Sequence, residues 1–540
     1  MSEGKNLSLP EAAVQEKRDT TGIRQDIYGE TVVTEAACDY TLPDYLPEIR
    51  KILSLRAQVL PAGRYESGGS IEFAGTVAHT VLYADGEGKL QSLPLHADYS
   101  FTVQMPSSEM SGATVDTMAE GTVCRLGGPR KISLRTRLSS HVHLFTRKSV
   151  MPEIRGMGSE RDQASLETLS ARLESMTLAG ASAQELALSA TIRLDSTGEN
   201  TRVVFSGGGV LANECRAEAG ACVVRGEVFA RVLCVDGEGS PYVLRERIPF
   251  ESRIEIEGVR EGDSCTANGR IAASDVSITK GEGEENGLLT LDLTIDLEAC
   301  AMGTEICEPM TALYSTAYEM TCHNKELTYH RPLGCTMGHY TVTAGRARSE
   351  CDGESAAAVV DADGRVELGT VTVENGRAVV SGRLYTDLIF TNPPEGESVA
   401  PLLLSAPICC PFRIESNLRV EEGCAPSFAC HAELICARGR IEQNTLAVDG
   451  EIAITLRAYE TKRKTVLADA EPAGSLPDSE RGERLFVVYP KNGDTLFTVA
   501  ARYHKKRAAV ARANALSEAA QANSASPASL DGVHHLLIED

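Results

Sequence analysis

The sequence contains no tryptophan, and only 5% of its residues are aromatic. Any hydrophobic core must therefore be built mainly from valine, leucine, isoleucine and alanine, and an apolar content of 42% is enough for such cores. Long apolar runs are also missing, since no stretch approaches the roughly 18 residues that a membrane-spanning helix needs. The first residues mix acidic and basic side chains and hold no apolar region typical of a signal peptide. We therefore expect no membrane span and a chain that is cytosolic when synthesised.

The sequence motifs of common enzyme classes are absent as well. There is no Gly-x-x-x-x-Gly-Lys-Ser/Thr phosphate loop, no Gly-x-Ser-x-Gly nucleophile elbow and no His-Glu-x-x-His zinc motif. The many carboxylates form no pair that stands out from the general acidity, so glycosidase chemistry is not indicated. We therefore predict no catalytic residue, no cofactor and no enzymatic activity.

Metal-binding patterns are equally weak. The 16 cysteines include no Cys-x-x-Cys pair. Most of them, such as Cys234 and Cys436, lie in apolar strand-like segments, where a buried cysteine acts as a small hydrophobic residue. His141 and His143 would share one face of a strand, but no third ligand is near them in sequence. The acidic loop 281–287 lacks the alternating ligands of a calcium loop. We predict no metal site.

Positive charge is scarce, with 53 Lys and Arg against 76 Asp and Glu and a net charge of −23. Nucleic acid is therefore not expected as a partner, because a phosphate backbone needs a basic footprint. The last sixty residues differ, since their basic residues slightly outnumber the acidic ones. Lys505, Lys506 and Arg507 form the densest basic cluster there. They fit either a solvated helix end or an electrostatic contact for an acidic partner.

One strand-and-turn pattern occurs three times. Residues 75–88 have a clear counterpart in 226–239, and a more diverged copy runs over 382–396. In each copy apolar residues alternate with other residues and lead into a turn sequence, which is Asp-Gly in the first two. This pattern is typical of a half-buried strand that enters a hairpin. The sequence therefore predicts a threefold repeat of a β-rich unit of about 150 residues.

Strand patterns and polar breaks divide the chain into six segments. We expect a mainly β fold of tandem antiparallel sandwich or barrel-like repeats, followed by a small α+β domain. A short helix is expected within 38–53, because two prolines there precede acidic residues. The predicted segments are a flexible N-terminal segment (1–19), three β repeats (20–154, 160–320 and 321–470), a linker (471–482) and a C-terminal domain (483–540).

The C-terminal segment reads as strand, helix, helix and strand. The strand 485–488 is followed by Asn-Gly-Asp-Thr, which turns the chain and caps a helix over 496–503. A second helix is expected over 507–513 and a closing strand over 535–538. Gly-Asp-Thr-Leu at 493–496 and Asn-Ala-Leu at 514–516 complete the pattern.

This segment resembles the LysM domain, although the loop 517–529 is longer than usual and Phe497 stands where Trp or Tyr is frequent. The resemblance implies binding of N-acetylglucosamine glycans such as peptidoglycan or chitin. The implied groove lies between the turn after the first strand and the loop before the second. Carried onto this chain, its residues are Gly493, Asp494, Thr495, Leu496, Phe497, Asn514, Ala515, Leu516, Asp531 and Gly532.

The β repeats resemble the SPOCS domain, a module of sporulation proteins in spore-forming Firmicutes. The resemblance rests on 39–49 and 75–88 in the first copy, and on 226–239 and 248–250 in the second. Tandem SPOCS domains followed by one LysM domain resemble the family of clostridial spore-coat morphogenesis proteins that partner the stage IV sporulation protein A ATPase.

The resemblance implies a non-enzymatic scaffold or adaptor that assembles in the mother-cell cytoplasm at the forespore surface, with its LysM domain on the ATPase. The alternative is a protein that binds peptidoglycan in the spore cortex or cell wall.

Overall fold

The computed structural model describes residues 22–60, 62–105, 112–195, 200–280, 286–347, 358–392, 402–443, 445–476, 485–516, 530 and 533–539. Most of the described chain forms β-strands, and these pair antiparallel with a single parallel exception between two of them. The mainly antiparallel β fold predicted from the sequence is confirmed. The predicted N-terminal segment 1–19 lies outside the described residues.

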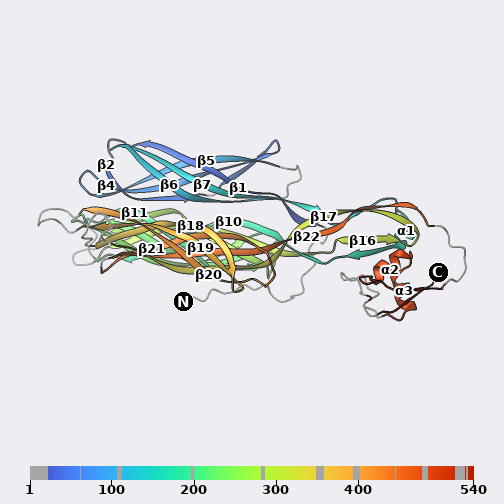
Figure 1. Cartoon of the computed structure of the whole chain (residues 1–540). Helices are drawn as coiled ribbons and strands as arrows, with labels where there is room; N and C mark the ends of the chain where they lie inside the picture. The colour runs from blue at the N-terminus through green and yellow to red at the C-terminus, as the bar shows by residue number, and fades with distance from the viewer. Residues whose placement is uncertain are drawn as a thin grey trace.

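The first unit is a sandwich of two antiparallel sheets, drawn in blue in Figure 1. Its strands are β1 (Gly22–Thr41), β2 (Ile49–Val59), β3 (Gly63–Ser67), β4 (Ser70–Asp85), β5 (Leu90–Gln104), β6 (Gly112–Gly128) and β7 (Lys131–Ser149). One sheet has the order β1–β7–β6, and in the other β4 pairs with β2, β3 and β5. Buried and exposed residues alternate along β5, so one face of its sheet packs on the other sheet.

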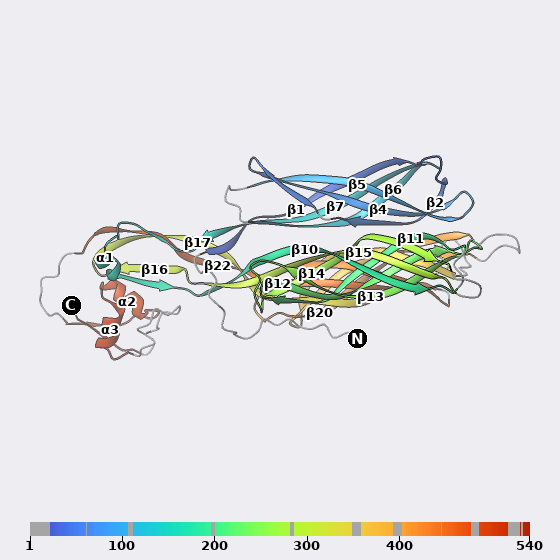
Figure 2. The ribbon, with the colours of Figure 1, turned by 180° about the vertical axis from the view of Figure 1, so that it is seen from behind.

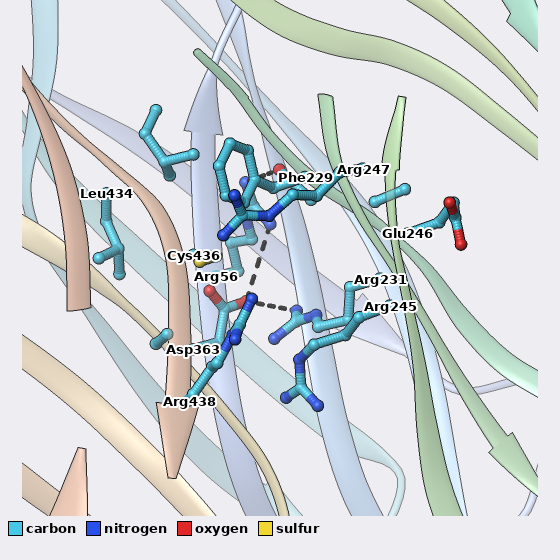
Figure 3. A pocket seen from close by; sticks show the side chains of 14 residues that line it. Arg56, Phe229, Arg231, Arg245, Glu246, Arg247, Asp363, Leu434, Cys436 and Arg438 are labelled. Atoms are coloured by element: carbon cyan, nitrogen blue, oxygen red, sulfur yellow. Dashed lines mark hydrogen bonds and ion pairs between the residues drawn. The ribbon is translucent and has the colours of Figure 1, made fainter. Parts of the chain in front are cut away.

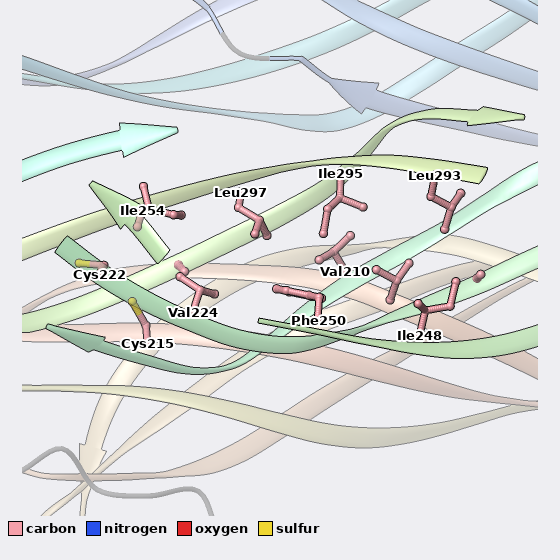
Figure 4. Packing of buried hydrophobic residues seen from close by; sticks show 14 of the residues in the cluster. Val210, Cys215, Cys222, Val224, Ile248, Phe250, Ile254, Leu293, Ile295 and Leu297 are labelled. Atoms are coloured by element: carbon pink, nitrogen blue, oxygen red, sulfur yellow. The ribbon is translucent and has the colours of Figure 1, made fainter. Parts of the chain in front are cut away.

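The second unit is a single six-stranded sheet that curls around its own core (Figure 4). Its strands are β10 (Leu173–Arg193), β11 (Arg202–Glu218), β12 (Ala221–Val235), β13 (Pro241–Glu255), β14 (Ser264–Thr279) and β15 (Leu288–Cys307). The order is β10–β15–β14–β11–β12–β13. β11 and β14 pair at Val210 and Gly269. A Cβ on Gly269 would lie 2.5 Å from Val210 Cγ1, so glycine permits the close approach that joins the two halves.

The third unit is again a pair of sheets around an aliphatic core. Its strands are β17 (Tyr318–Ala347), β18 (Ala358–Glu374), β19 (Arg377–Thr391), β20 (Leu403–Arg419), β21 (Pro426–Glu442) and β22 (Thr445–Ser475). The orders are β17–β22–β21 and β18–β19–β20. Each unit therefore pairs its first long strand with its last, and holds one central strand that is paired along both edges.

The three strand-and-turn segments found in the sequence coincide with these central strands, β4, β12 and β19. The first two turns share their hydrogen bonds. Asp85 Oδ1 and Asp236 Oδ1 each accept from the backbone N–H groups two and four residues later. Gly88 and Gly239 have φ of 81° and 87°, which a glycine adopts without strain. The Asp-Gly signal thus sets the turn in the same way twice.

The three units also contact one another through their central strands. Leu82, Leu233 and Ile389 occupy equivalent positions in β4, β12 and β19 and belong to one buried cluster. Figure 1 and its reverse view in Figure 2 show the first unit lying along the other two. Burial of these side chains on several strands at once stabilises the arrangement of the units.

A long ribbon carries the chain away from the three units. β17 and β22 pair over their full lengths, from Ala347 and Thr445 to Tyr318 and Ser475. Both figures show this ribbon extending beyond the sheets towards the C-terminal unit. Short elements line its far end, namely β8 (Glu153–Ile154), α1 (Glu160–Ser165), β9 (Leu166–Ser170) and β16 (Met310–Ser315).

The C-terminal unit has the predicted order of strand, helix, helix and strand. Its elements are β23 (Leu485–Val488), α2 (Leu496–Arg502), α3 (Arg507–Ala513) and β24 (Leu536–Glu539). β23 and β24 pair antiparallel, and the helices pack on them around Val499, Val510 and Leu536. The helices of the described chain have at most seven residues, too few to cross a membrane.

Two local predictions are wrong. In place of the helix expected within 38–53, the chain forms a turn closed by the bond from Leu46 N–H to the Pro43 carbonyl, with β1 ending at Thr41 and β2 beginning at Ile49. The side chain of Arg130 donates to the carbonyls of Pro43 and Leu46, so their bonds are made outside a helix. The linker expected from residue 471 is still strand, since β22 continues to Ser475 opposite Tyr318.

Candidate functional site

The turn before α2 is built by the residues that carried the LysM resemblance. Gly493 has φ of 87°, and Asp494 Oδ2 accepts from the backbone N–H of Lys491. Thr495 and Thr498 form a reciprocal capping box at the start of α2. Hydrogen bonding from Lys491 and from the guanidinium of Arg502, 3.0 Å away, holds the pKa of Asp494 below its usual value.

The predicted groove residues fall into four groups. Leu496 and Phe497 are buried in the core of the C-terminal unit, and Leu516 packs against it. Gly493 and Ala515 are exposed, whereas Asp494, Thr495 and Asn514 are half-buried. Asp531 and Gly532 lie outside the described residues.

Asn514 serves the fold directly. Its side-chain amide donates to the carbonyls of Val510 and Leu537, and its Oδ1 accepts from the Leu537 N–H at 2.6 Å. These bonds tie the end of α3 to β24. The amide groups that a ligand would contact are thus engaged within the unit.

The C-terminal unit packs against the short elements at the far end of the β17–β22 ribbon. The ring of Tyr314, from β16, meets Phe497 edge to face at 5.1 Å, and its hydroxyl donates to the Lys505 carbonyl at 2.9 Å. His504 Nδ1 lies 2.9 Å from the Ser315 carbonyl and its Nε2 lies 3.2 Å from Glu319. Tyr314 therefore belongs to the same buried cluster as α2 and α3.

The predicted basic cluster is split by this docking. Arg507 is buried, its Nε lies 3.0 Å from Glu167, and its second nitrogen donates to the Thr168 carbonyl. Lys505 is half-buried, whereas Lys506 is exposed. Arg507 is therefore engaged in contacts within the protein, and Lys506 is the member of the cluster that faces solvent.

An exposed apolar strand lies on the same unit. Leu485, Val487 and Tyr489, in and just after β23, are 58%, 51% and 72% exposed. Phe486 is also exposed and its ring stacks on Tyr503 at 6.5 Å. Contiguous exposed apolar side chains are a feature of surfaces that bind other proteins.

A second candidate site is a cavity of about 240 Å³ where the three β units meet. Figure 3 shows arginine side chains from several strands around it. They are Arg56 of β2, Arg231 of β12, Arg245 and Arg247 of β13, and Arg438 of β21. Phe229, Leu434 and Ile435 form an apolar part of its wall.

Two buried carboxylates neutralise part of this charge. Arg231 lies 3.0 Å from Asp361 and 2.8 Å from Asp363, and both aspartates come from β18. Arg56 lies 3.8 Å from Asp363 and Arg245 lies 3.4 Å from Asp361. Burial opposes the charge of Asp363, but the cations of Arg231 and Arg56 lower its pKa overall. Burial dominates at Asp361 and raises its pKa.

Three cysteines are brought together in the core of the second unit. The sulfur atoms of Cys215, Cys222 and Cys265 lie within 4.8 Å of one another, and all three are buried. Hydrogen bonds among the thiols, together with burial, raise the pKa of Cys215. Among the described residues these side chains could hold a soft metal ion with thiolate ligands, although a structural zinc site takes four ligands.

Neither of these clusters could be found in the sequence. The cavity arginines come from three units, and the cysteines come from β11, β12 and β14, so strand pairing alone unites them. The one sequence signal is Arg231 itself, a charged residue within the otherwise apolar stretch 228–235.

Comparison with known proteins gives one family. Residues 201–279 match the family model described as "SipL, SPOCS domain". This segment runs from the start of β11 to the end of β14 and includes the central strand β12. No curated protein matches the chain. The second unit is thus similar to a SPOCS domain, and this similarity supports a SipL-type, sporulation-related protein.

Proposed function

We propose that this protein is a non-enzymatic scaffold of spore-envelope assembly that binds the coat morphogenetic ATPase, of the stage IV sporulation protein A type, through its C-terminal unit. The observation that carries the proposal is the SPOCS-domain match at residues 201–279. On this proposal the protein works in the mother-cell cytoplasm and assembles at the forespore surface.

The shared strand order supports extending the SPOCS assignment to all three units. The first and third units have a central strand that is paired along both edges and pair their first long strand with their last, as the second unit does. Equivalent hydrophobic residues of the three central strands also meet in one cluster. On the proposal, three such units form one rigid platform.

The C-terminal unit supports a role in partner binding. Its strand–helix–helix–strand order and its Gly-Asp-Thr-Leu turn fit a LysM domain. The exposed apolar side chains of Leu485, Val487 and Tyr489 favour a protein partner, because glycans offer many hydroxyl groups and little apolar surface. We therefore place the ATPase contact at β23.

Peptidoglycan binding is the second candidate function. It is favoured by the exposure of Gly493 and Ala515, which both belong to the implied LysM groove. Because Asn514 is engaged by β24, a glycan would have to bind through other groups of this groove.

The test is a capture experiment with the full chain, since Tyr314 belongs to the core of the C-terminal unit and residues 483–540 alone would lack it. One bait is the purified ATPase and the other is insoluble peptidoglycan. Tyr489→Glu should lower capture by the ATPase about tenfold, as loss of an interface anchor does. Tyr65→Glu is the matched control, because Tyr65 is 76% exposed on β3 of the first unit.

Capture by the ATPase that Tyr489→Glu weakens and Tyr65→Glu leaves intact supports the proposal. Capture by peptidoglycan alone replaces it with the glycan-binding function. Equal capture of both variants by the ATPase would show that the contact does not lie at β23.

A further inference from the structure

We propose that the arginine-lined cavity between the three β units binds a small multivalent oxyanion, a phosphate group carried by a small molecule or free in solution. The proposal is independent of the proposed scaffold function, because it uses none of the C-terminal residues.

The protein's own contacts leave some of the guanidinium groups at the cavity available to a ligand. Arg231 and Arg56 are held by Asp361 and Asp363, and Arg56 also donates to the Gly208 carbonyl at 2.8 Å. Arg438 is exposed at the cavity and makes no ion pair or hydrogen bond with any described residue. Two cations are thus fixed as structure and others remain at the cavity.

Arg245 and Arg247 are the other cations that can still donate hydrogen bonds to a ligand. Arg245 has one ion pair, with Asp361 at 3.4 Å, and its side chain is 34% exposed. Arg247 lies 3.9 Å from Glu227 and 3.6 Å from Glu451, beyond hydrogen-bond distance. Its guanidinium lies over the Phe229 ring at 4.5 Å, which fixes its plane at the cavity wall.

The residues that line the cavity carry a net positive charge, and Asp361, Glu227 and Glu451 offset part of it from just outside the lining. The lining residues include five arginines and two acids, Asp363 and Glu246. Figure 3 shows Glu246 at the edge of the view, turned away from the arginines. Burial lowers the pKa of Arg245, Asp361 opposes this effect, and the cations of Arg231 and Arg438 add to it. Mutual repulsion of this kind is relieved when an anion enters.

The ligand class follows from the geometry of guanidinium. Each planar fork donates two parallel hydrogen bonds to oxygen atoms that share one centre, so arginine suits carboxylate and phosphate. Several such forks from different strands exceed what one singly charged carboxylate can satisfy. Pockets for drug-sized ligands have about 300–1,000 Å³, so the cavity of about 240 Å³ suits a phosphate or pyrophosphate group and no extended polyanion.

The experiment uses the full chain and isothermal titration with inorganic phosphate, pyrophosphate, citrate and chloride at constant ionic strength. Pyrophosphate and phosphate should give saturable binding, and chloride none. Arg245→Gln and Arg438→Gln should each weaken pyrophosphate binding about tenfold, the effect of losing one charge-assisted contact. Arg253→Gln is the control, because Arg253 lies on the same strand as Arg245 but pairs with Glu255 and Glu218 away from the cavity.

Thermal unfolding of each variant shows that it is folded, and both arginines are accessible enough to be replaced without opening the core. A glycerol phosphate titration separates a phosphorylated small molecule from free phosphate. Absence of saturable binding by every phosphate, binding of citrate alone, or equal weakening by Arg253→Gln would each overturn the proposal.

Discussion

Arg231 occupies a position at which the three repeats have diverged. The equivalent residues are Thr80 in β4 and Asp387 in β19, each two positions before the shared contact of Leu82, Leu233 and Ile389. A hydroxyl, a cation and a carboxylate therefore occupy one structural position. The cation has buried partners, because β18 supplies Asp361 and Asp363.

Replacement of Arg231 should be costly. Arg231→Ala leaves Asp361, which is 1% exposed, without its closest cation. Removing one partner of a buried ion pair destabilises by about 3–5 kcal/mol. Urea unfolding of the full chain measures the loss. Arg253→Ala, on an exposed arginine with two surface ion pairs, should cost about 1 kcal/mol or less, and similar losses in the two variants would contradict the buried network.

For Asp387 we expect the opposite effect, a gain in stability when the charge is removed, because the surroundings of this side chain disfavour its charged form. Burial and the carboxylate of Asp363 raise its pKa to about 6, against the opposing Leu55 N–H and Arg365. The folded chain thus binds this proton more tightly than the unfolded chain, whose aspartates titrate near about 3.9. The free energy of unfolding should therefore rise as the pH falls through about 6.

Asp387→Asn tests this effect. The neutral amide keeps an oxygen acceptor for the Leu55 N–H and should stabilise the chain at about pH 7.5 by about 1–2 kcal/mol. The gain should shrink as the pH falls through about 6 and vanish below about pH 3.9, where the carboxyl is protonated in the unfolded chain as well. Urea unfolding across this range measures it. A variant that is less stable than the wild type throughout would show that the charged form is favoured.

The elements whose hydrogen bonds are made between neighbouring residues were predicted well from the sequence. The strand-and-turn segments carry their own hydrogen bonds, as at Asp85 and Asp236, and Thr495 caps α2 with a residue three positions away. Such bonds can be inferred from neighbouring residues alone. The end of β22 could not be, because Ser475 is strand only through its pairing with Tyr318 of β17.

The docking of α2 and α3 on β16 also escaped prediction, and it has a testable consequence. Tyr314→Ala removes a buried ring from the shared core and should destabilise the C-terminal unit by about 3–5 kcal/mol. Tyr314→Phe keeps the ring and loses the hydroxyl bond to Lys505, at a cost of about 1 kcal/mol. Hydrogen exchange of the amides in α2 and α3 reports the effect.

Faster exchange in Tyr314→Ala than in Tyr314→Phe, confined to the C-terminal unit, is the expected pattern. Unchanged exchange in both variants would mean that the unit folds without the ribbon end. That outcome would also justify experiments with the C-terminal unit alone.

At the scale of the whole molecule, composition and repeats predicted the class of fold but not how the units meet. The contact of Leu82, Leu233 and Ile389 and the cavity around Arg231 both depend on three units whose strands are far apart in sequence. No local pattern encodes such a meeting. The candidate site at the C-terminus was identified from its turn motif, whereas the cavity required the assembled structure.

One contact between the first and third units should make the assembly sensitive to alkaline pH. His431 Nδ1, on β21, lies 3.5 Å from Asp116 on β6. Burial opposes the charge of His431, but Asp116, with Glu433 and Glu298, raises its pKa to about 9. His141 and Arg457 also face Asp116, and with His431 they hold the pKa of Asp116 below its usual value despite burial.

The sign of the pH effect follows from these shifts. Because the folded pKa of His431 exceeds its unfolded value of about 6.5, its contribution is complete below about pH 6.5 and is lost as the pH rises through about 9. Calorimetric melting temperatures should therefore fall over this range. Asp116→Asn removes the carboxylate that sustains the charge and should flatten the decline, while the titration of lysines and cysteines remains common to both proteins. If the two proteins decline in parallel, His431 is not the group that makes the assembly sensitive to alkaline pH, and the apolar contact of the central strands and the ion pair of Arg56 with Asp363 hold the first unit on the third without it.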